Sequence, residues 1–199
     1  MTTTTASPRP AVTDAELHPL LAGRWSTRAF DPAHALSAAQ TTALLEAARW
    51  TPSASNTQPW RFAVTHRGTP AHEAVLATLA PGNQTWADAA SAFVVAAAVT
   101  VGPDGDERPW AVYDTGQAVA HLTVQAEHEG LAVHQIGGFD RAALAAVLDG
   151  PAAAVPLVVL AVGRHDPTVA LPEPFASRET AERTRLPLAS LVVEVRPAA

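Results

Sequence analysis

Arginines in two short segments have the spacing needed to hold an anion. The first segment, Arg24-Trp25-Ser26-Thr27-Arg28, carries two guanidinium groups and a hydroxyl, and Arg183 and Arg185 alternate near the end of the chain. Alternate residues of an extended segment point to one side, and the planar guanidinium fork suits a phosphate or a carbonyl-rich ring edge. Each segment also fits a simpler interpretation, in which the arginines only solvate a loop or a basic tail.

Two further segments can shape a pocket from backbone and small polar groups. The first, Pro52-Ser53-Ala54-Ser55-Asn56-Thr57-Gln58-Pro59-Trp60, concentrates hydroxyl and amide side chains between two prolines and ends in a tryptophan. The second, Gln135-Ile136-Gly137-Gly138-Phe139-Asp140, places two glycines where the backbone can approach a ligand closely. The alternatives are an ordinary connector and a tight strand-to-helix turn.

Residue types missing from the chain exclude several kinds of chemistry. All 13 basic residues are arginine and there is no cysteine, so Schiff bases, thiolate nucleophiles and cysteine-ligated metals are excluded. The Gly-x-Gly-x-x-Gly, Gly-x-Ser-x-Gly and His-Glu-x-x-His motifs are also missing. His121 and His128 share one predicted helix face, which fits exposed helix histidines better than a metal site. We therefore predict neither a catalytic side chain nor a metal.

Length and charge set the overall class of protein. The 199 residues fit a single domain, which we place at residues 15–199 after a disordered tail over residues 1–14. A net charge of −6 argues against a nucleic-acid partner. The longest apolar runs, residues 92–101 and 155–162, fall short of the roughly 20 residues that span a bilayer. With no signal peptide pattern at the start, we expect a cytoplasmic protein without a membrane partner.

The elements that must position these segments mix helices and strands without strict alternation. Helices are predicted over residues 18–23, 38–50, 70–79, 109–129 and 140–148, with Ser37 and Asp140 as caps. Strands are predicted over residues 60–65, 92–101, 131–136 and 155–163, and residues 191–195 fit a strand or a short helix followed by a strand. Pro81-Gly82-Asn83 is expected to act as a breaker. In the helix 109–129, one apolar face is expected to hold Trp110, Tyr113, Val119, Leu122 and Ala126. This mixture favours an α+β fold, one sheet covered by helices.

Taken together, the four segments resemble the nitroreductase family of flavin mononucleotide (FMN) enzymes. The early arginine motif of that family is matched by Arg24, Ser26, Arg28 and Phe30, and its loop motif by Pro52, Ser53, Asn56, Gln58, Pro59 and Trp60. Weaker matches follow in the same order along the chain, at Asp114, Gly116, Ala118, Leu122, Gly138, Phe139, Arg183, Arg185 and Pro187. The resemblance spans residues 18–193, and its loop motif is the most specific part.

The resemblance implies a fold, an assembly and a set of cofactor-binding residues. The fold would be a central, mostly antiparallel mixed sheet flanked by helices, with a C-terminal segment extending onto the partner subunit of a homodimer. Two FMN molecules would lie between the subunits, and Pro52, Ser53 and Ala54 would come from the partner chain. The residues implied in FMN binding are Arg24, Trp25, Ser26, Arg28, Pro52, Ser53, Ala54, Asn56, Gln58, Ile136, Gly137, Gly138, Arg183 and Arg185.

In the implied arrangement, different residues contact different parts of the cofactor. Arg24, Ser26 and Arg28 would hold the phosphate and the pyrimidine edge, and Arg183 and Arg185 would meet the phosphate. Asn56 would support the loop or the ring. The segment Ile136–Gly138 would lie along the ring, with one backbone N–H reaching N5. A guanidinium such as Arg28 would stabilise negative charge on the reduced ring.

The implied activity is reduction of a small acceptor, such as a nitroaromatic or a quinone, by NAD(P)H through FMN. Such chemistry takes place on the flavin and needs no acid or base from a side chain. Two alternatives remain open, a flavin-binding protein without turnover and a flavin-dependent dehydrogenase of a small amide metabolite. The chain departs from some relatives in using arginine rather than lysine before Pro187 and in having only a brief segment after Trp86, where larger relatives insert a lid. Substrate specificity is therefore not transferable.

Overall fold

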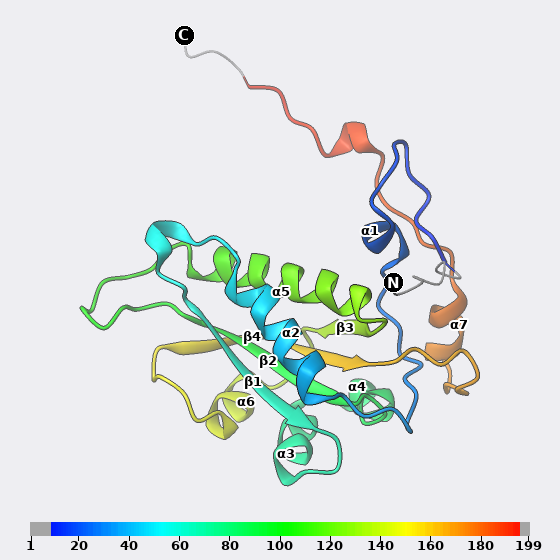
Figure 1. Cartoon of the computed structure of the whole chain (residues 1–199), viewed down its shortest axis with the longest axis horizontal. Helices are drawn as coiled ribbons and strands as arrows, with labels where there is room; N and C mark the ends of the chain where they lie inside the picture. Colours follow the sequence, from blue (N-terminus) through cyan, green and yellow to red (C-terminus); the bar gives the residue numbers. More distant parts are fainter. Residues whose placement is uncertain (1–8, 196–199) are drawn as a thin grey trace.

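A four-stranded antiparallel sheet forms the centre of the computed structural model, which describes residues 9–195 (Figure 1). The strands are β1 (Trp60–His66), β2 (Ala92–Val99), β3 (Ala132–Ile136) and β4 (Ala154–Gly163), in the order β1-β2-β4-β3. The inner strands β2 and β4 are the apolar runs of the sequence, and every residue of β2 is buried. The α+β class is confirmed, and all three strand pairings are antiparallel.

Alternation along the inner strands divides the core into two layers. In β2, Ala92, Val94 and Ala96 face one hydrophobic cluster, while Phe93 and Val95 face the other. The first cluster lies under α2 (Ala38–Arg49) and α5 (Ala111–His128), which pack against each other on one face of the sheet. The second lies under α3 (Pro70–Thr78), α4 (Pro81–Ala87) and α6 (Arg141–Val147). The sheet is therefore covered by helices on both faces.

Local sequence explains where several helices begin and end. Ser37 and Gln40 form a reciprocal capping box at the start of α2. Asp140 accepts a hydrogen bond from the backbone N–H of Ala143 and so caps α6. Gly130, which follows α5, has φ +69°, the left-handed conformation that glycine adopts readily at a helix end. The short α1 (Pro19–Gly23) contacts α5.

Two helices and the end of the chain differ from the sequence predictions. Pro81 was expected to break a helix, but it is the first residue of α4. At this position the missing N–H of proline costs nothing, because the first N–H groups of a helix have no partner within it. The helix α7 (Phe175–Thr180) falls in a segment with little regular pattern. Residues 191–195 form no strand and follow the 3₁₀-helix η2 (Leu188–Ser190), since a strand needs a partner and none of the described strands lies beside them.

The buried face of α5 also differs from the prediction. Asp114, Ala118 and Leu122 point into the core, together with Ala111, Thr115, Val119, Thr123 and Ala126. Trp110 and Tyr113 are instead 60% and 63% exposed. The prediction favoured aromatic rings over small residues, but alanine and threonine let α5 approach α2 and the sheet closely, and this placed the aromatic pair outside.

Of the tail predicted over residues 1–14, residues 1–8 lie outside the described part of the chain. Residues 9–14 form no helix or strand. Arg9 nevertheless contacts the carbonyl groups of Glu179 and Ala181, and Ala11 donates its N–H to Ala22 at 2.9 Å. This part of the tail therefore runs beside the segment that leads into the first arginine motif. Among the described residues, no helix combines the length and hydropathy needed to cross a membrane.

Candidate functional site

Two of the four segments singled out in the sequence, the first arginine motif and Ile136–Gly138, contact β3 or the helix α4. His134 of β3 has its Nδ1 atom 2.9 Å from the carbonyl oxygen of Thr27, which brings the first arginine motif against this strand. The segment Ile136–Gly138 continues from β3, and the carbonyl of Gly138 accepts hydrogen bonds from Ala80 and from the side chain of Asn83. β3 is an edge strand of the described sheet, and the first arginine motif lies beside it.

Arg183 reaches back to the first motif and forms part of a cluster of positive charge. Its guanidinium donates to the carbonyl oxygens of Ala22 at 2.9 Å and Arg24 at 2.8 Å, and it also contacts the carbonyl of Arg9. Burial lowers the pKa of Arg183, and the neighbouring charges of Arg24, Arg185 and Arg9 lower it further. We call these four residues the arginine cluster. Arg185 is exposed and donates to the carbonyl of Thr184 at 2.7 Å.

One carboxyl group faces the arginine cluster from α5. Burial raises the pKa of Glu127 to about 7, although Arg24 and Arg183 both lower it. At neutral pH this carboxyl group therefore compensates the cluster only in part. Arg24 and Arg183 therefore keep an excess of positive charge over Glu127, which fits an anion such as a phosphate.

The guanidinium group of Arg28 lies close to two aromatic rings. Its guanidinium carbon lies 5.6 Å from the ring centroids of both Trp86 and Phe175, within cation–π range. The Arg28 backbone N–H donates to Glu179 Oε2 at 3.0 Å, and the Thr27 hydroxyl contacts Oε1 of the same carboxylate. Burial lowers the pKa of Arg28, while Glu179 raises it. Glu179 therefore fixes the backbone of the motif from α7.

The remaining residues of the first motif face different surroundings. Ser26 is exposed, and Trp25 packs edge-on against His165 with ring centroids 5.1 Å apart. The guanidinium of Arg9 lies 4.4 Å from the Trp25 ring centroid. Arg24 is partly buried beside Arg183. Trp25 thus packs between Arg9 and His165, the second of which follows β4.

The two glycines leave room beside β3. A Cβ atom added at Gly137 would meet no atom within 4 Å, whereas one at Gly138 would lie 3.0 Å from Asn83 Nδ2. Gly137 also lacks a positive φ, so neither packing nor backbone conformation within the chain requires glycine at this position. A flat ligand lying against the backbone would require it. The open glycine and the arginine cluster together fit a cofactor with a planar ring and a phosphate.

The fourth segment, residues 52–58, which we call the Pro52 loop, has an unusual backbone. Ser55, Asn56 and Gln58 have φ of 49°, 55° and 46°, and a positive φ is costly for non-glycine residues. Internal hydrogen bonds hold this shape, from Gln58 N–H to Ser53 Oγ at 3.0 Å and from Gln58 Nε2 to Asn56 Oδ1 at 3.2 Å. The loop includes the 3₁₀-helix η1 (Ala54–Asn56). Asn56 and Gln58 therefore support the loop itself.

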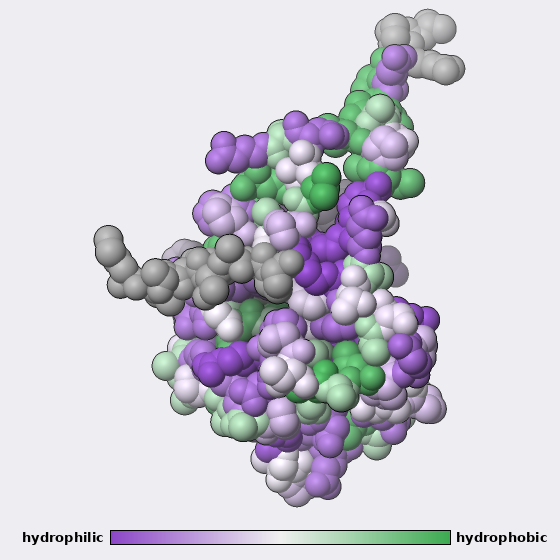
Figure 2. Space-filling model, turned by 90° about the vertical axis from the view of Figure 1, so that its right-hand side faces the viewer, coloured by the Kyte–Doolittle hydropathy of each residue, from purple (hydrophilic) through white to green (hydrophobic). Residues whose placement is uncertain are grey.

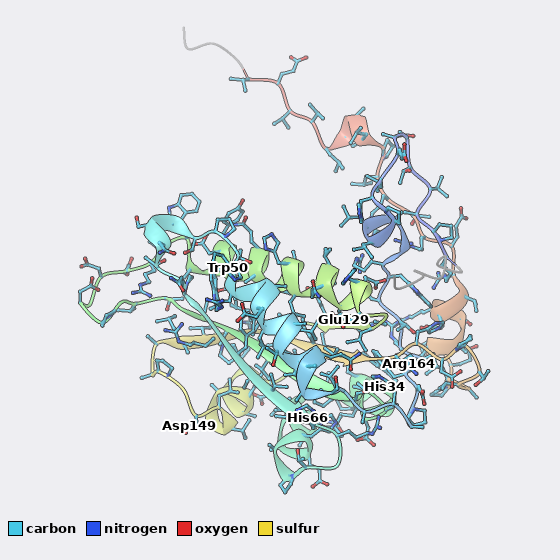
Figure 3. All side chains as sticks on the ribbon, in the orientation of Figure 1. His34, Trp50, His66, Glu129, Asp149 and Arg164 are labelled. Carbon is cyan, nitrogen blue, oxygen red and sulfur yellow. The ribbon has the colours of Figure 1, made fainter. Side chains whose placement is uncertain are left out.

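The Pro52 loop lies far from the arginine cluster. Its Ala54 N–H donates to Asp114 Oδ2 at 3.0 Å, in the first turn of α5. The arginine cluster lies beside Glu127 in the last turn, and 13 residues of helix span about 20 Å. In Figure 3, Trp50 next to the loop and Glu129 at the other end of α5 mark this separation. A single chain thus carries two half-sites at opposite ends of one helix.

Sequence reasoning missed the residues that brace the first motif. Glu179, Trp86, Phe175 and His134 contact it from α7, α4 and β3. Glu179 is 151 residues away from Arg28 along the chain, so no local pattern links them. Among residues 9–195, no group of three or more histidine, cysteine or acidic side chains is placed to hold a metal.

The fold is that of an α+β protein in which candidate binding residues lie beside the edge strand β3. The nitroreductase family model matches residues 21–164, and this chain belongs to that family. A solved structure described as an oxidoreductase containing FMN has 31% sequence identity and a TM-score of 0.87, over 96% of this chain and 97% of the other. The family and the α+β fold predicted from the sequence are thereby confirmed, and the extension of the C-terminal segment onto a partner subunit stays a prediction.

Two curated proteins match parts of the chain. An uncharacterized 15.4 kDa protein in the ask 5′ region of Mycolicibacterium smegmatis is 36% identical over 115 residues, which cover 57% of this chain and 76% of that protein. A Bacillus subtilis (strain 168) protein named "Putative NAD(P)H nitroreductase YdgI" is 41% identical over 75 residues, covering 38% of this chain and 35% of its own length.

Proposed function

We propose that this protein is an FMN-dependent oxidoreductase that uses NAD(P)H to reduce a small acceptor such as a quinone or a nitroaromatic. The observation that carries the proposal is a group of arginines that Glu127 compensates only in part, in the same chain as the open backbone at Gly137. The similarity to an FMN-containing oxidoreductase over nearly the whole chain supports it. The name of the YdgI relative supports NAD(P)H as the reductant.

FMN would supply the redox chemistry. In the overall reaction, a quinone, NAD(P)H and a proton would give the hydroquinone and NAD(P)⁺. The chain would supply binding and electrostatics. Arg24, Arg183 and Arg185 would hold the phosphate, and Arg28, braced by Glu179, would offer positive charge at the ring edge. The backbone over Ile136–Gly138 would lie against the ring, where the missing Cβ of Gly137 leaves space.

A homodimer is part of this proposal, because the Pro52 loop lies about 20 Å from the arginine cluster along α5. The loop of each chain would complete the site of its partner. Residues 186–195, which we call the C-terminal arm, support a second copy. The arm extends from the body in Figure 1, and Figure 2 shows hydrophobic residues gathered on it. Leu191, Val192 and Val193 are 64%, 71% and 86% exposed, and burying them would favour association.

The test uses the purified full-length protein. We expect it to be a yellow dimer by sedimentation that releases FMN rather than FAD on denaturation. Adding NAD(P)H without oxygen should bleach the flavin absorbance, and adding a quinone should restore it. Bound FMN that NAD(P)H does not bleach would instead identify a flavin-binding protein or a dehydrogenase of another donor. A colourless protein that also fails to take up added FMN would refute the proposal.

A further inference from the structure

A pocket of about 170 Å³, which we call the α6 pocket, lies between the sheet and the segment that joins α6 to β4. Residues of β1 and β2 form its floor, where Ala63 of one strand is paired with Val95 of the other. The pocket is hollow because many of its lining side chains are small, and they leave space that larger side chains would fill. These small residues are Ala63, Ala97, Ala145, Ala152 and Ala154.

The walls of the α6 pocket are held by contacts within the chain. Arg141, the first residue of α6, donates to the carbonyl oxygen of Pro156 at 3.3 Å, which ties the helix to β4. Leu144 anchors the same helix in the core. At the rim, the backbone N–H of Ala154 donates to the carbonyl oxygen of Pro151 at 2.8 Å and closes a turn. The pocket is therefore formed before any ligand arrives, as small-molecule sites usually are.

Two side chains of opposite charge line the α6 pocket. Arg61 uses its Nη1 atom to donate to the backbone carbonyls of Gln58 at 3.1 Å and Trp60 at 2.7 Å, which fixes the guanidinium group. Asp149 comes shortly after α6, at the place labelled in Figure 3. Within residues 9–195, the structure pairs Arg61 with no carboxylate and Asp149 with no cation. Each charge is therefore available to a ligand group of the opposite sign.

We infer that the α6 pocket binds a small apolar α-amino acid, with its side chain inside the pocket, its carboxylate on Arg61 and its ammonium group on Asp149. The remaining guanidinium donors of Arg61 suit a carboxylate, and the carboxylate of Asp149 can accept from an ammonium group. Neither contact involves a flavin. The inference therefore goes beyond the proposed function and does not depend on it.

The size of the α6 pocket agrees with such a ligand. A cavity of about 150 Å³ holds a benzene molecule, so about 170 Å³ accommodates a branched aliphatic side chain such as that of leucine. Burying this side chain against Val95 and Leu148 supplies most of the affinity, because exposed charges contribute little on their own. The two charges then select the ligand, since a molecule that lacks the carboxylate or the amine leaves one of them without a partner.

Calorimetric titration of the purified full-length protein, after incubation with FMN, tests the inference. The probe is L-leucine, compared with isocaproate, which lacks the amine, and isoamylamine, which lacks the carboxylate. We expect leucine to bind about tenfold or more tightly than either analogue. Asp149→Asn should weaken leucine binding and leave isocaproate binding unchanged, whereas Arg61→Gln should weaken the binding of both.

A substitution that fills the pocket shows where leucine binds. Ala145→Leu adds bulk from α6 at an exposed position, and Ala146→Leu is the matched control, because Ala146 is also exposed on α6 but does not line the pocket. We expect Ala145→Leu to abolish leucine binding and Ala146→Leu to keep the affinity within about threefold of the wild type.

Three outcomes would overturn the inference. The wild-type protein could bind no leucine at millimolar concentrations, it could bind isocaproate as tightly as leucine, or Ala145→Leu could bind leucine as tightly as Ala146→Leu does. FMN uptake and bleaching by NAD(P)H are measured on the same preparations. A protein that takes up FMN but binds no leucine overturns only the inference, and a protein that binds leucine but takes up no FMN overturns only the proposed function.

Discussion

The side chains of Arg183 and Arg185 differ in the number of hydrogen bonds that they donate within the chain. Arg183 holds the carbonyl groups of Ala22 and Arg24, whereas Arg185 is exposed. Hydrogen bonds to charged groups contribute about 1.5–3 kcal/mol each, so we expect Arg183→Ala with Arg185→Ala to weaken FMN binding by roughly a hundredfold or more. Titration of the FMN-free protein measures this.

The single variants and a control sharpen that prediction. Arg183→Ala should weaken FMN binding more than Arg185→Ala, because it also releases the segment at Arg24. Arg49→Ala is the control, since Arg49 pairs with Glu46 on the surface of α2. Unchanged FMN affinity in the double variant would place the phosphate elsewhere on the molecule.

Glu179 offers a second test at this scale, as a positioning residue. Its carboxylate binds the Thr27 hydroxyl and the Arg28 N–H, so Glu179→Gln loses a charge-assisted bond but keeps the shape. We expect FMN affinity to fall by about tenfold, corresponding to roughly 1.4 kcal/mol. The exposed Glu182→Gln serves as the control, and equal affinities in the two variants would show that the brace does not matter.

Single residues also show the limits of prediction from sequence. The four segments carry recognisable local patterns, so the sequence alone is enough to name their residues. Glu179, Trp86 and Phe175 meet Arg28 only through the fold, and no spacing in the sequence connects them. Residues that brace a motif from distant elements are set by tertiary packing, which a local pattern does not contain.

At the scale of elements, the joint between the Pro52 loop and α5 can be broken by one substitution. Asp114 is buried, and its Oδ2 accepts the N–H of Ala54. Asp114→Ala leaves this N–H without its acceptor, and the loss of a buried hydrogen bond to a charged group costs about 1.5–3 kcal/mol. We expect the free energy of unfolding to fall by that amount and the FMN content to drop.

Asp114→Asn provides the conservative comparison for this joint, because its amide oxygen can still accept the Ala54 N–H. It should recover most of the FMN content that Asp114→Ala loses, as measured by the flavin absorbance per protein chain. Full FMN content in Asp114→Ala would mean that the loop needs no anchor.

Elements differed in how well the sequence predicted them. Apolar runs such as β2 and capped helices such as α2 were predicted closely, because burial and capping leave local signals. The short α4 and α7 were missed, since one or two turns depend on tertiary contacts more than on propensity. For α5, Val119, Leu122 and Ala126 face the core as predicted, but Trp110 and Tyr113 do not, because small residues take the core positions of the first turns.

At the scale of the whole molecule, the buried histidines should make a contribution to stability that is lost in mild acid. Burial lowers the pKa of His72, which stacks on Phe93 with ring centroids 4.1 Å apart, and burial likewise lowers that of His134. Both are therefore neutral in the folded protein, while in the unfolded chain they titrate near 6.5. Acid favours the form that binds more protons, so this stability is complete above pH 6.5 and declines as the pH falls toward the folded values.

Thermal unfolding at pH 7.5 and pH 5 measures this effect. Protonation of Glu127, whose pKa burial raises to about 7, stabilises the folded protein over the same interval and opposes the histidines. The test therefore compares variants, and we expect His72→Phe to raise the melting temperature at pH 5, relative to the wild type, more than at pH 7.5. His66 is exposed at the end of β1, so His66→Phe is the matched control and should leave the difference unchanged. A difference that is equal in both variants would assign the acid sensitivity to other groups.

The span of α5 between the two half-sites has a genetic consequence. In a symmetric pair of chains, each subunit lends its loop to one site and its arginines to the other, so two different defects can complement each other. A chain carrying Asp114→Ala and a chain carrying Arg183→Ala with Arg185→Ala would each assemble a poor flavoprotein alone. Co-expressed under separate affinity tags, they would form mixed pairs in which one site inherits both damaged halves and the other inherits neither. Purification through both tags should recover about one FMN per pair, and recovery of none would place each complete site within a single chain.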